Sequence, residues 1–513
     1  MKNRYILLLA GMLLISAGCD GSKPEPDHPN FLLLSIDTVR ADHLGCYGNE
    51  RWSTSPSPNI DRLAAQGVLF ENYYAPRGQT HPSLASMLTG KYPITHTLRE
   101  NGFILPTRHL TLIQMLKKQG YRTAAFASNL PDRDNPENPQ SHPAWWTRGC
   151  DSFDDGYGDN FEAETKLAAI EDQYRWDQRI EDHLMNWIKE FKTEVGSPFF
   201  LWAHFYDPHK PYIPPESSPD LYPDYKGPLE KLISENEGKP VDNVTALINN
   251  ATRQSRPLTD EDRKKVMALY DASVYGVDAR FDRILSALHE KGMLKNTWII
   301  ITSDHGEELG DHQNYYFHGA SIYDAVLKIP LIIVGPEAKA GKRITNLVQN
   351  VDLAPSLLYL AGYNPLPGME GYSFADLLRG KADRTERNFV VAEWQDLIYS
   401  WSDGEYKYIL NPLGACPVKP PFARVNSAFE YDTEELYNIK KDPGEQVNIL
   451  TGNEGVAQSL RKELEQWIRQ DQHQKSMQTS ISAEGSMEAM QALGYTGATK
   501  DRHDVRFKPK DNK

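Results

Sequence analysis

Acidic and histidine side chains follow two apolar runs that each have the composition of a buried strand. Asp37 ends the run "NFLLLSID" (residues 30–37), and Asp304 and His305 directly follow "TWIIITS". A buried carboxylate is costly unless it is paired or binds a metal ion. Two carboxylates and an imidazole are suitable ligands for a divalent cation. The pattern therefore predicts a metal site formed by Asp37, Asp304 and His305, with a capping role as the alternative at Asp37.

A hydroxyl and two further histidines can take part in catalysis beside such a cation. Thr80 lies in "GQTHPSLASMLTGKYP", His209 in "DPHKPY" and His318 in "YYFHGA". A threonine hydroxyl can act as a nucleophile, and a histidine can protonate a leaving group or hold an anionic oxygen. A single loop histidine is more often a surface residue. A catalytic role is favoured only if the fold places both histidines at the same edge of the sheet.

The elements that must position these residues alternate between apolar runs and helical patterns. Runs such as "SPFFLWAHFYD" and "KIPLIIVGP" are typical of strands buried on both faces, and "SPNIDRLAAQG" and "DARFDRILSALHEKG" have helical periodicity. The alternation predicts an α/β fold: a large, mostly parallel sheet sandwiched by helices. Ligands bind at the carboxyl ends of strands in such sheets. We therefore expect Asp37, Asp207 and Asp304 at one edge.

The composition changes along the chain and predicts five segments. "NFVVAEWQDLIYSWSDGEYKYILNP" is typical of antiparallel strands, and "GVAQSLRKELEQWIRQ" predicts an amphipathic helix. The predicted segments are a signal peptide (1–19), a tether (20–29), a catalytic domain (30–375), a smaller C-terminal α+β subdomain (376–475) and a polar tail (476–513).

The N-terminus has the features of an export signal. Lys2 and Arg4 precede an apolar run over residues 5–15, which is too short for a comfortable membrane span. Small residues before Cys19 resemble a bacterial lipobox, although Ser16 stands where leucine is usual. We interpret Cys19 as the lipidated first residue of a lipoprotein in the bacterial cell envelope, either periplasmic or on the surface. A plain cleaved signal and an uncleaved anchor are the alternatives.

Six stretches, in order, resemble the sulfatase family of the alkaline phosphatase superfamily over residues 29–450. They are "LLLSIDTVRADHLGCYG", "THPSLASMLTGKYP", "YDPHKPY", "TSDHGEELGDH…HGASIYDAVLKIPLII", "NVDLAPSLLYLAG…GYSFADLLRG" and "ELYNIKKDPGEQVNIL". The resemblance implies an alkaline-phosphatase-like fold and metal-dependent hydrolysis of sulfate esters. It also implies catalytic roles for His209 and His318 and a small-molecule or glycan ester as substrate.

Thr80 stands where the family has a cysteine or serine that is oxidised to formylglycine. The hydrated aldehyde of formylglycine expels sulfate by collapsing, and threonine offers no such route. We therefore expect no formylglycine, and Thr80 as both direct nucleophile and fourth ligand of one divalent cation, Ca²⁺ first, with Mn²⁺ or Zn²⁺ as alternatives. A phosphoryl group on Thr80 needs no aldehyde exit, because water can attack phosphorus in a second displacement.

Other family positions also differ in this chain. Leu84 replaces the signature arginine, Ser128 and Leu130 stand at the lysine and histidine positions, and Thr38 replaces the second aspartate of the opening pair. Much of the positive charge that would bind sulfate is therefore missing. Arg40 and Lys91 remain as candidate substrate-binding residues.

The overall charge limits the classes of molecule that the protein is expected to bind. The 513 residues carry a formal net charge of −14 and no long basic run, which argues against nucleic acid. An anionic substrate remains compatible, because a bound cation reverses the local sign. Three readings stay open: a sulfate ester hydrolase; a hydrolase of phosphate mono- or diesters or a phospho-head-group transferase; and an inactive lipoprotein that binds a glycan.

Overall fold

The computed structural model of the chain describes residues 28–128, 145–155, 173–192, 197–210, 212–227, 258–313, 315–319, 321–395, 397–412 and 432–472. The predicted signal peptide with Cys19, most of the tether, Leu130 and the polar tail lie outside the described residues. Within the described residues, no helix is both long and apolar enough to cross a membrane.

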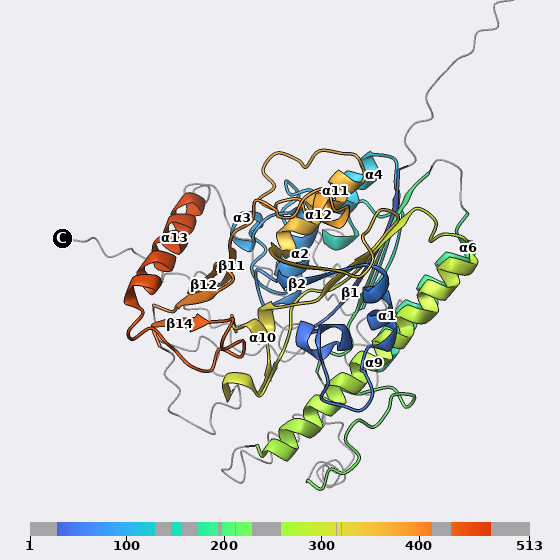
Figure 1. The fold of residues 1–513 in the computed structure, drawn as a ribbon. Helices are drawn as coiled ribbons and strands as arrows, with labels where there is room; N and C mark the ends of the chain where they lie inside the picture. Colours follow the sequence, from blue (N-terminus) through green and yellow to red (C-terminus); the bar gives the residue numbers. More distant parts are fainter. Residues whose placement is uncertain are drawn as a thin grey trace, which may run out of the picture.

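An eight-stranded sheet forms the centre of the structure (Figure 1). Its strands, in spatial order, are β10 (Lys342–Gln349), β2 (Val68–Tyr74), β9 (Leu331–Val334), β6 (Thr297–Ser303), β1 (Asn30–Ile36), β5 (Phe199–Phe205), β3 (Arg122–Ala127) and β4 (Ser152–Asp154). Strand β9 is antiparallel to both neighbours, and all other pairs are parallel. The predicted α/β fold with a mostly parallel sheet is confirmed, with one reversed strand.

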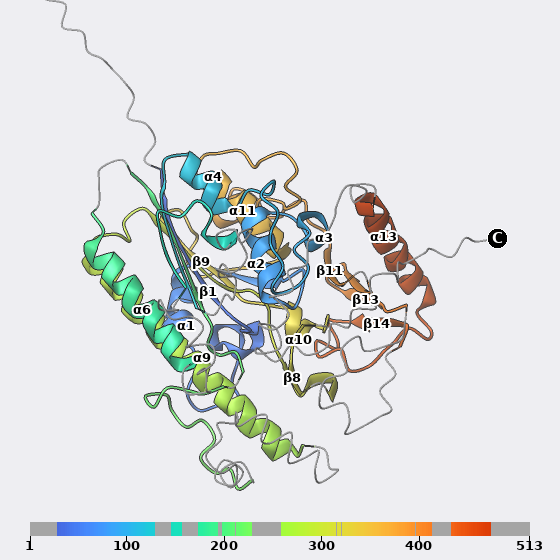
Figure 2. The ribbon, with the colours of Figure 1, turned by 180° about the vertical axis from the view of Figure 1, so that it is seen from behind.

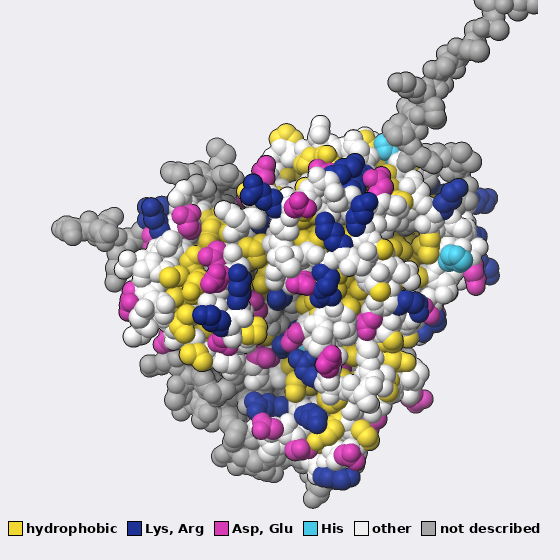
Figure 3. Space-filling view, viewed as in Figure 1, with side chains coloured by type: hydrophobic (Ala, Val, Ile, Leu, Met, Phe, Trp, Pro, Cys, Tyr) yellow, Lys and Arg dark blue, Asp and Glu magenta, His cyan; other side chains and the backbone are white. Residues whose placement is uncertain are grey.

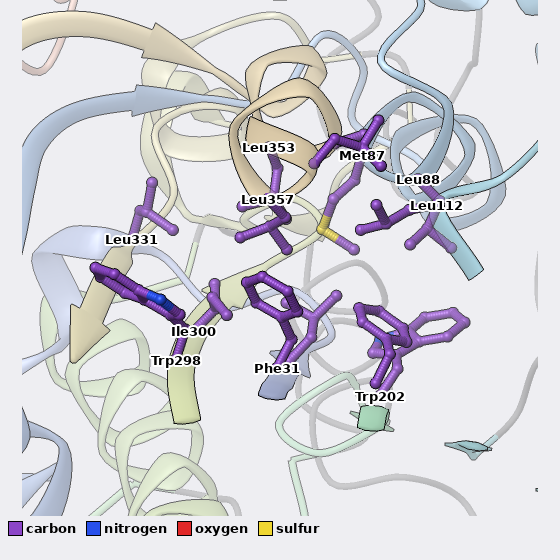
Figure 4. Close-up of a cluster of buried hydrophobic side chains, with 14 of the residues drawn as sticks. Phe31, Met87, Leu88, Leu112, Trp202, Trp298, Ile300, Leu331, Leu353 and Leu357 are labelled. Atoms are coloured by element: carbon purple, nitrogen blue, oxygen red, sulfur yellow. The ribbon is translucent and has the colours of Figure 1, made fainter. Parts of the chain in front are cut away.

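Helices cover both faces of this sheet (Figures 1 and 2). One face packs against α1 (Pro58–Gln66), α6 (Gln173–Glu190) and α9 (Asp260–Glu290). The other face packs against α2 (Thr80–Thr89), α4 (Leu112–Lys118), α11 (Leu353–Leu360) and α12 (Ala375–Leu378). Figure 4 shows this second core, in which Phe31, Trp202 and Ile300 of the strands face helical leucines and Met87.

Side-chain alternation along the strands decides which face each polar group joins. Phe31 and Leu33 belong to the core beneath α2, whereas Leu32 and Leu34 belong to the core beneath α9. Because successive side chains of a strand point to opposite faces, Ser35 lies on the α2 face. The backbone N–H of Asp37 still donates to Phe205 O at 2.8 Å, so β-type pairing continues to the end of β1.

A four-stranded antiparallel sheet lies beside the larger unit. It consists of β11 (Val390–Trp394), β12 (Ile398–Ser402), β13 (Tyr406–Leu410) and β14 (Glu434–Asn438), and α13 (Glu454–Gln472) covers one face. The other face packs against residues of the larger unit such as Tyr74 and Leu347. The expected antiparallel strands and amphipathic helix are therefore present, while the segment boundaries stay predictions.

Short elements connect these layers. They are α3 (Pro93–His96), α10 (Asp324–Leu327), the paired strands β7 (Glu308–Leu309) and β8 (Tyr315–Phe317), and the 3₁₀ helices η1 (Ala41–His43), η2 (Gly45–Tyr47), η3 (Trp145–Thr147), η5 (Asp311–Gln313) and η6 (Asn350–Asp352). Cationic and anionic side chains are interspersed over the face shown in Figure 3. Cys46 and Cys150 are free, and Cys416 lies outside the described residues.

Candidate active site

The carboxyl ends of β1 and β6 bring the three predicted metal ligands together. One ligand atom from each of Asp37, Asp304 and His305 lies within 4.8 Å of the other two. His305 Nε2 is 3.4 Å from Asp304 Oδ2 and 3.8 Å from Asp37 Oδ1. All three side chains are buried. Strands that pair directly in parallel (β1 with β6) end at the same edge, which explains this convergence.

The two carboxylates leave oxygens that fit a cation. Asp37 Oδ1 and Asp304 Oδ2 are buried and lack a hydrogen-bond partner. Burial, and then the negative charges of Asp304 and Glu307, raise the pKa of Asp37 well above its usual value. A divalent cation would offset both effects, since it replaces lost solvation and screens like charges. Asp37, Asp304 and His305 therefore suit a bound metal ion.

Backbone contacts orient the ligands toward this point. Asp304 Oδ1 accepts hydrogen bonds from the N–H groups of Thr38 at 3.2 Å and His305 at 2.8 Å, which leaves Oδ2 for the cation. His305 Nδ1 lies 3.0 Å from Gly306 O, so Nδ1–H donates to it and Nε2 keeps its lone pair for the cluster. Thr38 adopts φ 56°, which is unusual for a β-branched residue and marks strain beside the site.

Thr80 enters this group as the first residue of α2. Its Oγ1 is 3.4 Å from His305 Nε2. Ser83, one turn later, donates to Asp304 O at 2.6 Å and ties the helix to the end of β6. Gly78 permits the close approach before the helix, because a Cβ there would stand 2.5 Å from Val326 Cγ1. In the first turn of α2, the N–H of His81 donates to Asn101 Oδ1 at 2.9 Å, and Pro82 has no N–H group.

His209 and His318 are brought together beside His305. The ring of His318 lies 4.5 Å from that of His305 and 5.2 Å from that of His209, measured between centroids. His318 Nδ1 is 3.0 Å from Glu307 Oε1. Burial, and then the neighbouring histidines, lower the pKa of His318 well below its usual value and that of His209 to about 3. Both imidazoles are therefore neutral at neutral pH in the metal-free protein.

The two predicted cationic residues have other partners. The Arg40 guanidinium donates to Asp42 at 2.9 Å and to Asp311 at 2.6 Å, so two carboxylates surround its charge. Lys91 Nζ lies 3.4 Å from His109 Nδ1, and partial burial lowers its pKa. A substrate-binding role for Arg40 and Lys91 stays a prediction.

Ser128, at the family's lysine position, belongs to a structural contact. Its hydroxyl donates to Asp177 of α6, and Asp177 also accepts from the N–H groups of Tyr206 at 2.9 Å and Asp207 at 3.0 Å. Burial raises the pKa of both Asp177 and Asp207. Asp207, expected at the sheet edge with Asp37 and Asp304, therefore sits beside a buried carboxyl that organises the end of β5.

Several residues near the site were missed by sequence reasoning. Glu307 pairs with His318, and His81 and His204 are buried histidines whose pKa values burial lowers to about 4. His81 directly follows Thr80, and His204 stands within the apolar run of β5. A histidine inside an apolar run was the signal available for His204.

A buried ion pair connects the smaller sheet to the Thr80 turn. Arg77 donates to Glu393 of β11 at 2.8 Å and to Gln79 at 2.9 Å, and Gln79 directly precedes Thr80. Arg99 donates to the same carboxylate at 2.6 Å. Glu393 thus holds two guanidinium groups near the start of α2.

Comparison with known proteins identifies the family. The model of the Sulfatase family matches residues 29–363. The chain belongs to the Sulfatase family. A second model, N-sulphoglucosamine sulphohydrolase, C-terminal, matches residues 310–474 of this sulfatase-family protein. The protein is therefore a sulfatase-family ester hydrolase, and the expected family resemblance is confirmed.

Relatives of this sulfatase-family protein cover most of its length. It is 28% identical to an arylsulfatase of Clostridium perfringens over 83% of this chain and 91% of the relative. It is 26% identical to a Delta 4,5-hexuronate-2-O-sulfatase of Bacteroides thetaiotaomicron, over 84% of this chain and 86% of the relative.

Solved structures share the fold at lower identity. The phosphonate monoester hydrolase of Agrobacterium radiobacter has a TM-score of 0.64 at 20% identity and covers 86% of this chain and 96% of its own. A structure in complex with its substrate D-glucosamine-2-N,6-O-disulfate has a TM-score of 0.63 at 22% identity, and covers 87% of this chain and 99% of its own.

Proposed function

We propose that this protein is an exported, metal-dependent hydrolase of sulfate esters in which Thr80 is the nucleophile. The observation that carries the proposal is the position of Thr80 Oγ1, 3.4 Å from His305 Nε2 and next to two unpartnered carboxylate oxygens. Asp37, Asp304 and His305 hold one divalent cation, and Thr80 is its fourth ligand. Carboxylates suit Ca²⁺ and Mn²⁺ and imidazole suits Zn²⁺ and Mn²⁺; we take Ca²⁺ as the first candidate.

When bound, the cation supplies Lewis acidity, which lowers the pKa of the Thr80 hydroxyl and screens the anionic ester. Side chains of the protein perform the nucleophilic attack and the proton transfers. Thr80 Oγ1 bonds to the central sulfur or phosphorus while the bond from that atom to the ester oxygen breaks. Water then attacks the central atom and frees Thr80.

An imidazole moves the proton in each step. His318 is the first candidate because Glu307 Oε1 lies 3.0 Å from its Nδ1 and fixes the ring, as a carboxylate does in other catalytic pairs. Neutral Nε2 of His318 takes the proton of the attacking hydroxyl and returns it to the leaving oxygen. His209 is the alternative carrier, since its ring lies 5.2 Å from that of His318.

The substrate class follows from the family and from Thr80. Relatives named as sulfatases of hexuronate and aryl esters support a small-molecule or glycan sulfate ester. The phosphonate monoester hydrolases that share the fold favour a second candidate, a phosphate mono- or diester hydrolase or a head-group transferase. Phosphorus chemistry suits Thr80, because water can release a phosphoryl group without an aldehyde. A binding protein without activity is the remaining alternative.

Paired hydrolysis assays test the proposal. Purified protein lacking residues 1–19 is given aryl sulfate, aryl phosphate and aryl phosphodiester, with and without chelator, beside Thr80→Ala and Thr80→Ser. Chelator-sensitive turnover of the sulfate that Thr80→Ala abolishes and Thr80→Ser retains supports the sulfatase. Turnover of the phospho substrates alone moves the assignment to phosphoryl transfer. No turnover of any ester, together with no stoichiometric metal, supports the binding protein.

Export as a lipoprotein is part of the same proposal. The "SAGC" sequence before Asp20 supports lipidation of Cys19 and a place in the bacterial envelope. Labelling with a fatty acid, followed by membrane fractionation, should detect the lipid on the wild type and lose it in Cys19→Ala. Unlabelled wild-type protein would contradict the anchor.

A further inference from the structure

Three buried aromatic side chains near Thr80 carry nitrogen atoms without partners. Both ring nitrogens of His81, Nε2 of His204 and Nε1 of Trp145 lack a hydrogen-bond partner, and all three residues are buried. A buried unsatisfied donor or acceptor costs roughly 1–3 kcal/mol, so such groups are rare unless something satisfies them. Their concentration beside one catalytic residue requires an explanation.

The three side chains approach the site from different elements. His81 lies in the first turn of α2, directly after Thr80. His204 lies near the carboxyl end of β5, opposite Ser35 of β1, on the sheet face beneath α2. Trp145 begins η3, and its ring centroid is 6.2 Å from that of His81. The group therefore lies between the nucleophile helix and the sheet edge that holds Asp37 and Asp304.

The hydrogen bonds of Ser35 favour one tautomer of His204. Ser35 Oγ accepts from Trp202 Nε1 at 2.8 Å and lies 2.9 Å from His204 Nδ1. Ser35 satisfies its own hydroxyl proton only by donating to Nδ1. The proton of a neutral His204 ring is then on Nε2, which is the atom without a partner.

Donors therefore outnumber acceptors in this group. Nε2–H of His204 and Nε1–H of Trp145 can only donate, and at least one nitrogen of His81 carries a proton in either charge state. Three N–H groups thus face at most one nitrogen lone pair. Oxygen atoms with several lone pairs satisfy such a set. Within the described parts of the chain, Asp37, Asp304 and His305 are the only three acidic, histidine or cysteine side chains whose ligand atoms converge, so a second cation site has less support.

We propose that His81, His204 and Trp145 form a donor pocket that binds an oxygen of the tetrahedral sulfate or phosphate group, in the ester and in the released anion. This inference rests on the proposed function, because it assigns the anion-binding half of the same site. Uncharged donors here would take over from the cationic residues that Leu84 and Ser128 replace. The cation and the pocket would then hold different oxygens of one group.

Anion binding by the metal-loaded protein tests the pocket. Inorganic sulfate and inorganic phosphate are titrated by calorimetry into the wild type, Trp145→Phe, His81→Gln and the control Trp146→Phe. Trp145→Phe keeps an aromatic ring but removes the N–H group together with part of the indole, and Trp146→Phe makes the same truncation at a neighbouring buried tryptophan. Because hydrogen bonds to charged groups contribute about 1.5–3 kcal/mol, we expect Trp145→Phe and His81→Gln each to raise Kd at least tenfold. Trp146 Nε1 is also buried without a partner, but the ring of Trp146 packs edge-on against Trp202 and Phe153, so Trp146→Phe should change Kd by less than twofold.

A parallel titration with Ca²⁺ separates the pocket from the metal site. Metal affinity should be unchanged in Trp145→Phe, which shows that the cation site is intact, and its melting temperature should fall by about as much as that of Trp146→Phe, because both remove part of a buried indole. The pocket is refuted if the wild type binds neither anion, if Trp145→Phe and His81→Gln bind as tightly as the wild type, or if Trp146→Phe weakens binding equally.

The two proposals can fail separately. Trp145-dependent anion binding without hydrolysis of any ester would support the pocket and reject the hydrolase. Thr80-dependent hydrolysis with anion binding unchanged in both pocket variants would support the hydrolase and reject the pocket.

Discussion

Replacing Glu393 with glutamine should destabilise the fold and slow catalysis together, because this carboxylate serves two guanidinium groups. Glu393 accepts from Arg77 at 2.8 Å and from Arg99 at 2.6 Å. Arg77 also donates to Gln79, which directly precedes Thr80. The smaller sheet therefore helps to hold the turn that carries Thr80.

The burial of the Arg77–Glu393 pair determines how much stability the substitution removes. The Arg77 side chain is 0% exposed and that of Glu393 is 1% exposed, so the pair is removed from water. Removing one charge of a buried pair costs about 3–5 kcal/mol, because the other charge stays buried. The surface pair Arg62–Asp282, with side chains 56% and 45% exposed, is worth about 0–1 kcal/mol. We expect Glu393→Gln to lower the free energy of unfolding by about 3 kcal/mol or more, and Asp282→Asn by less than about 1 kcal/mol.

Urea unfolding at neutral pH, followed by tryptophan fluorescence, measures both changes. Steady-state kinetics on the best ester substrate should show a lower kcat for Glu393→Gln and an unchanged kcat for Asp282→Asn. Equal shifts of the unfolding midpoint in the two variants would refute the burial argument. A destabilised Glu393→Gln protein with the wild-type kcat would refute the connection to the Thr80 turn.

Three further predictions concern metal, pH and backbone. Adding Ca²⁺ at about 1,000 times its Kd should raise the free energy of unfolding by about 4 kcal/mol. Chelator should reverse this gain, and Asp37→Asn should abolish it. A melting temperature, measured by calorimetry, that does not change with Ca²⁺ would contradict the metal site. Burial lowers the pKa of His312, but the negative charge of Glu308, whose Oε2 lies 3.6 Å from His312 Nδ1, outweighs burial and raises the pKa to about 9. A raised pKa stabilises the fold below the unfolded value near 6.5, and this contribution is lost as pH rises through 9. The free energy of unfolding should therefore fall by about 1–3 kcal/mol more between pH 6 and pH 10 in the wild type than in His312→Asn. Asparagine is the chosen replacement because it tolerates the local φ of 47°. Gly78→Ala should lower kcat by tenfold or more, because the new Cβ would stand 2.5 Å from Val326 Cγ1 and move the Thr80 turn. The control Gly455→Ala in α13, where nothing lies within 4 Å of the new Cβ, should leave kcat unchanged. A Gly78→Ala protein with the wild-type kcat would count against the role of the turn.

The sequence predicted the sheet because its strands are buried on both faces and therefore read as unbroken apolar runs. It did not predict the reversal of β9, since "PLIIV" contains nothing that sets strand direction. It also predicted only the second half of α9, which begins at Asp260 and is capped by Thr259. The first half carries buried polar residues such as Asp271, which interrupt the apolar pattern.

The convergence of Asp37, Asp304 and His305 was predictable because each of them directly follows a strand, where local composition and position coincide. The rest of the site depends on contacts between distant segments. Arg77 and Glu393 are 316 residues apart in the sequence. Glu307 contacts His318 only because the chain folds back after the strand that precedes Glu307. His204 stands inside an apolar run, which is a sequence signal, but the unpartnered nitrogens of His81 and His204 are visible only in the structure.

The direction of β1 has a consequence for how the enzyme meets its substrate. The chain before the strand is fixed by His28, whose Nδ1 lies 2.9 Å from Ala361 O, and by Pro29, whose carbonyl accepts from Tyr121. Strand β1 then spans seven residues, about 23 Å at roughly 3.3 Å per residue, before it reaches the site at Asp37. The polypeptide thus joins the domain at the edge opposite the metal ligands. If Cys19 carries a lipid, the anchored end of the chain therefore enters the domain one full strand length away from Asp37 and Thr80.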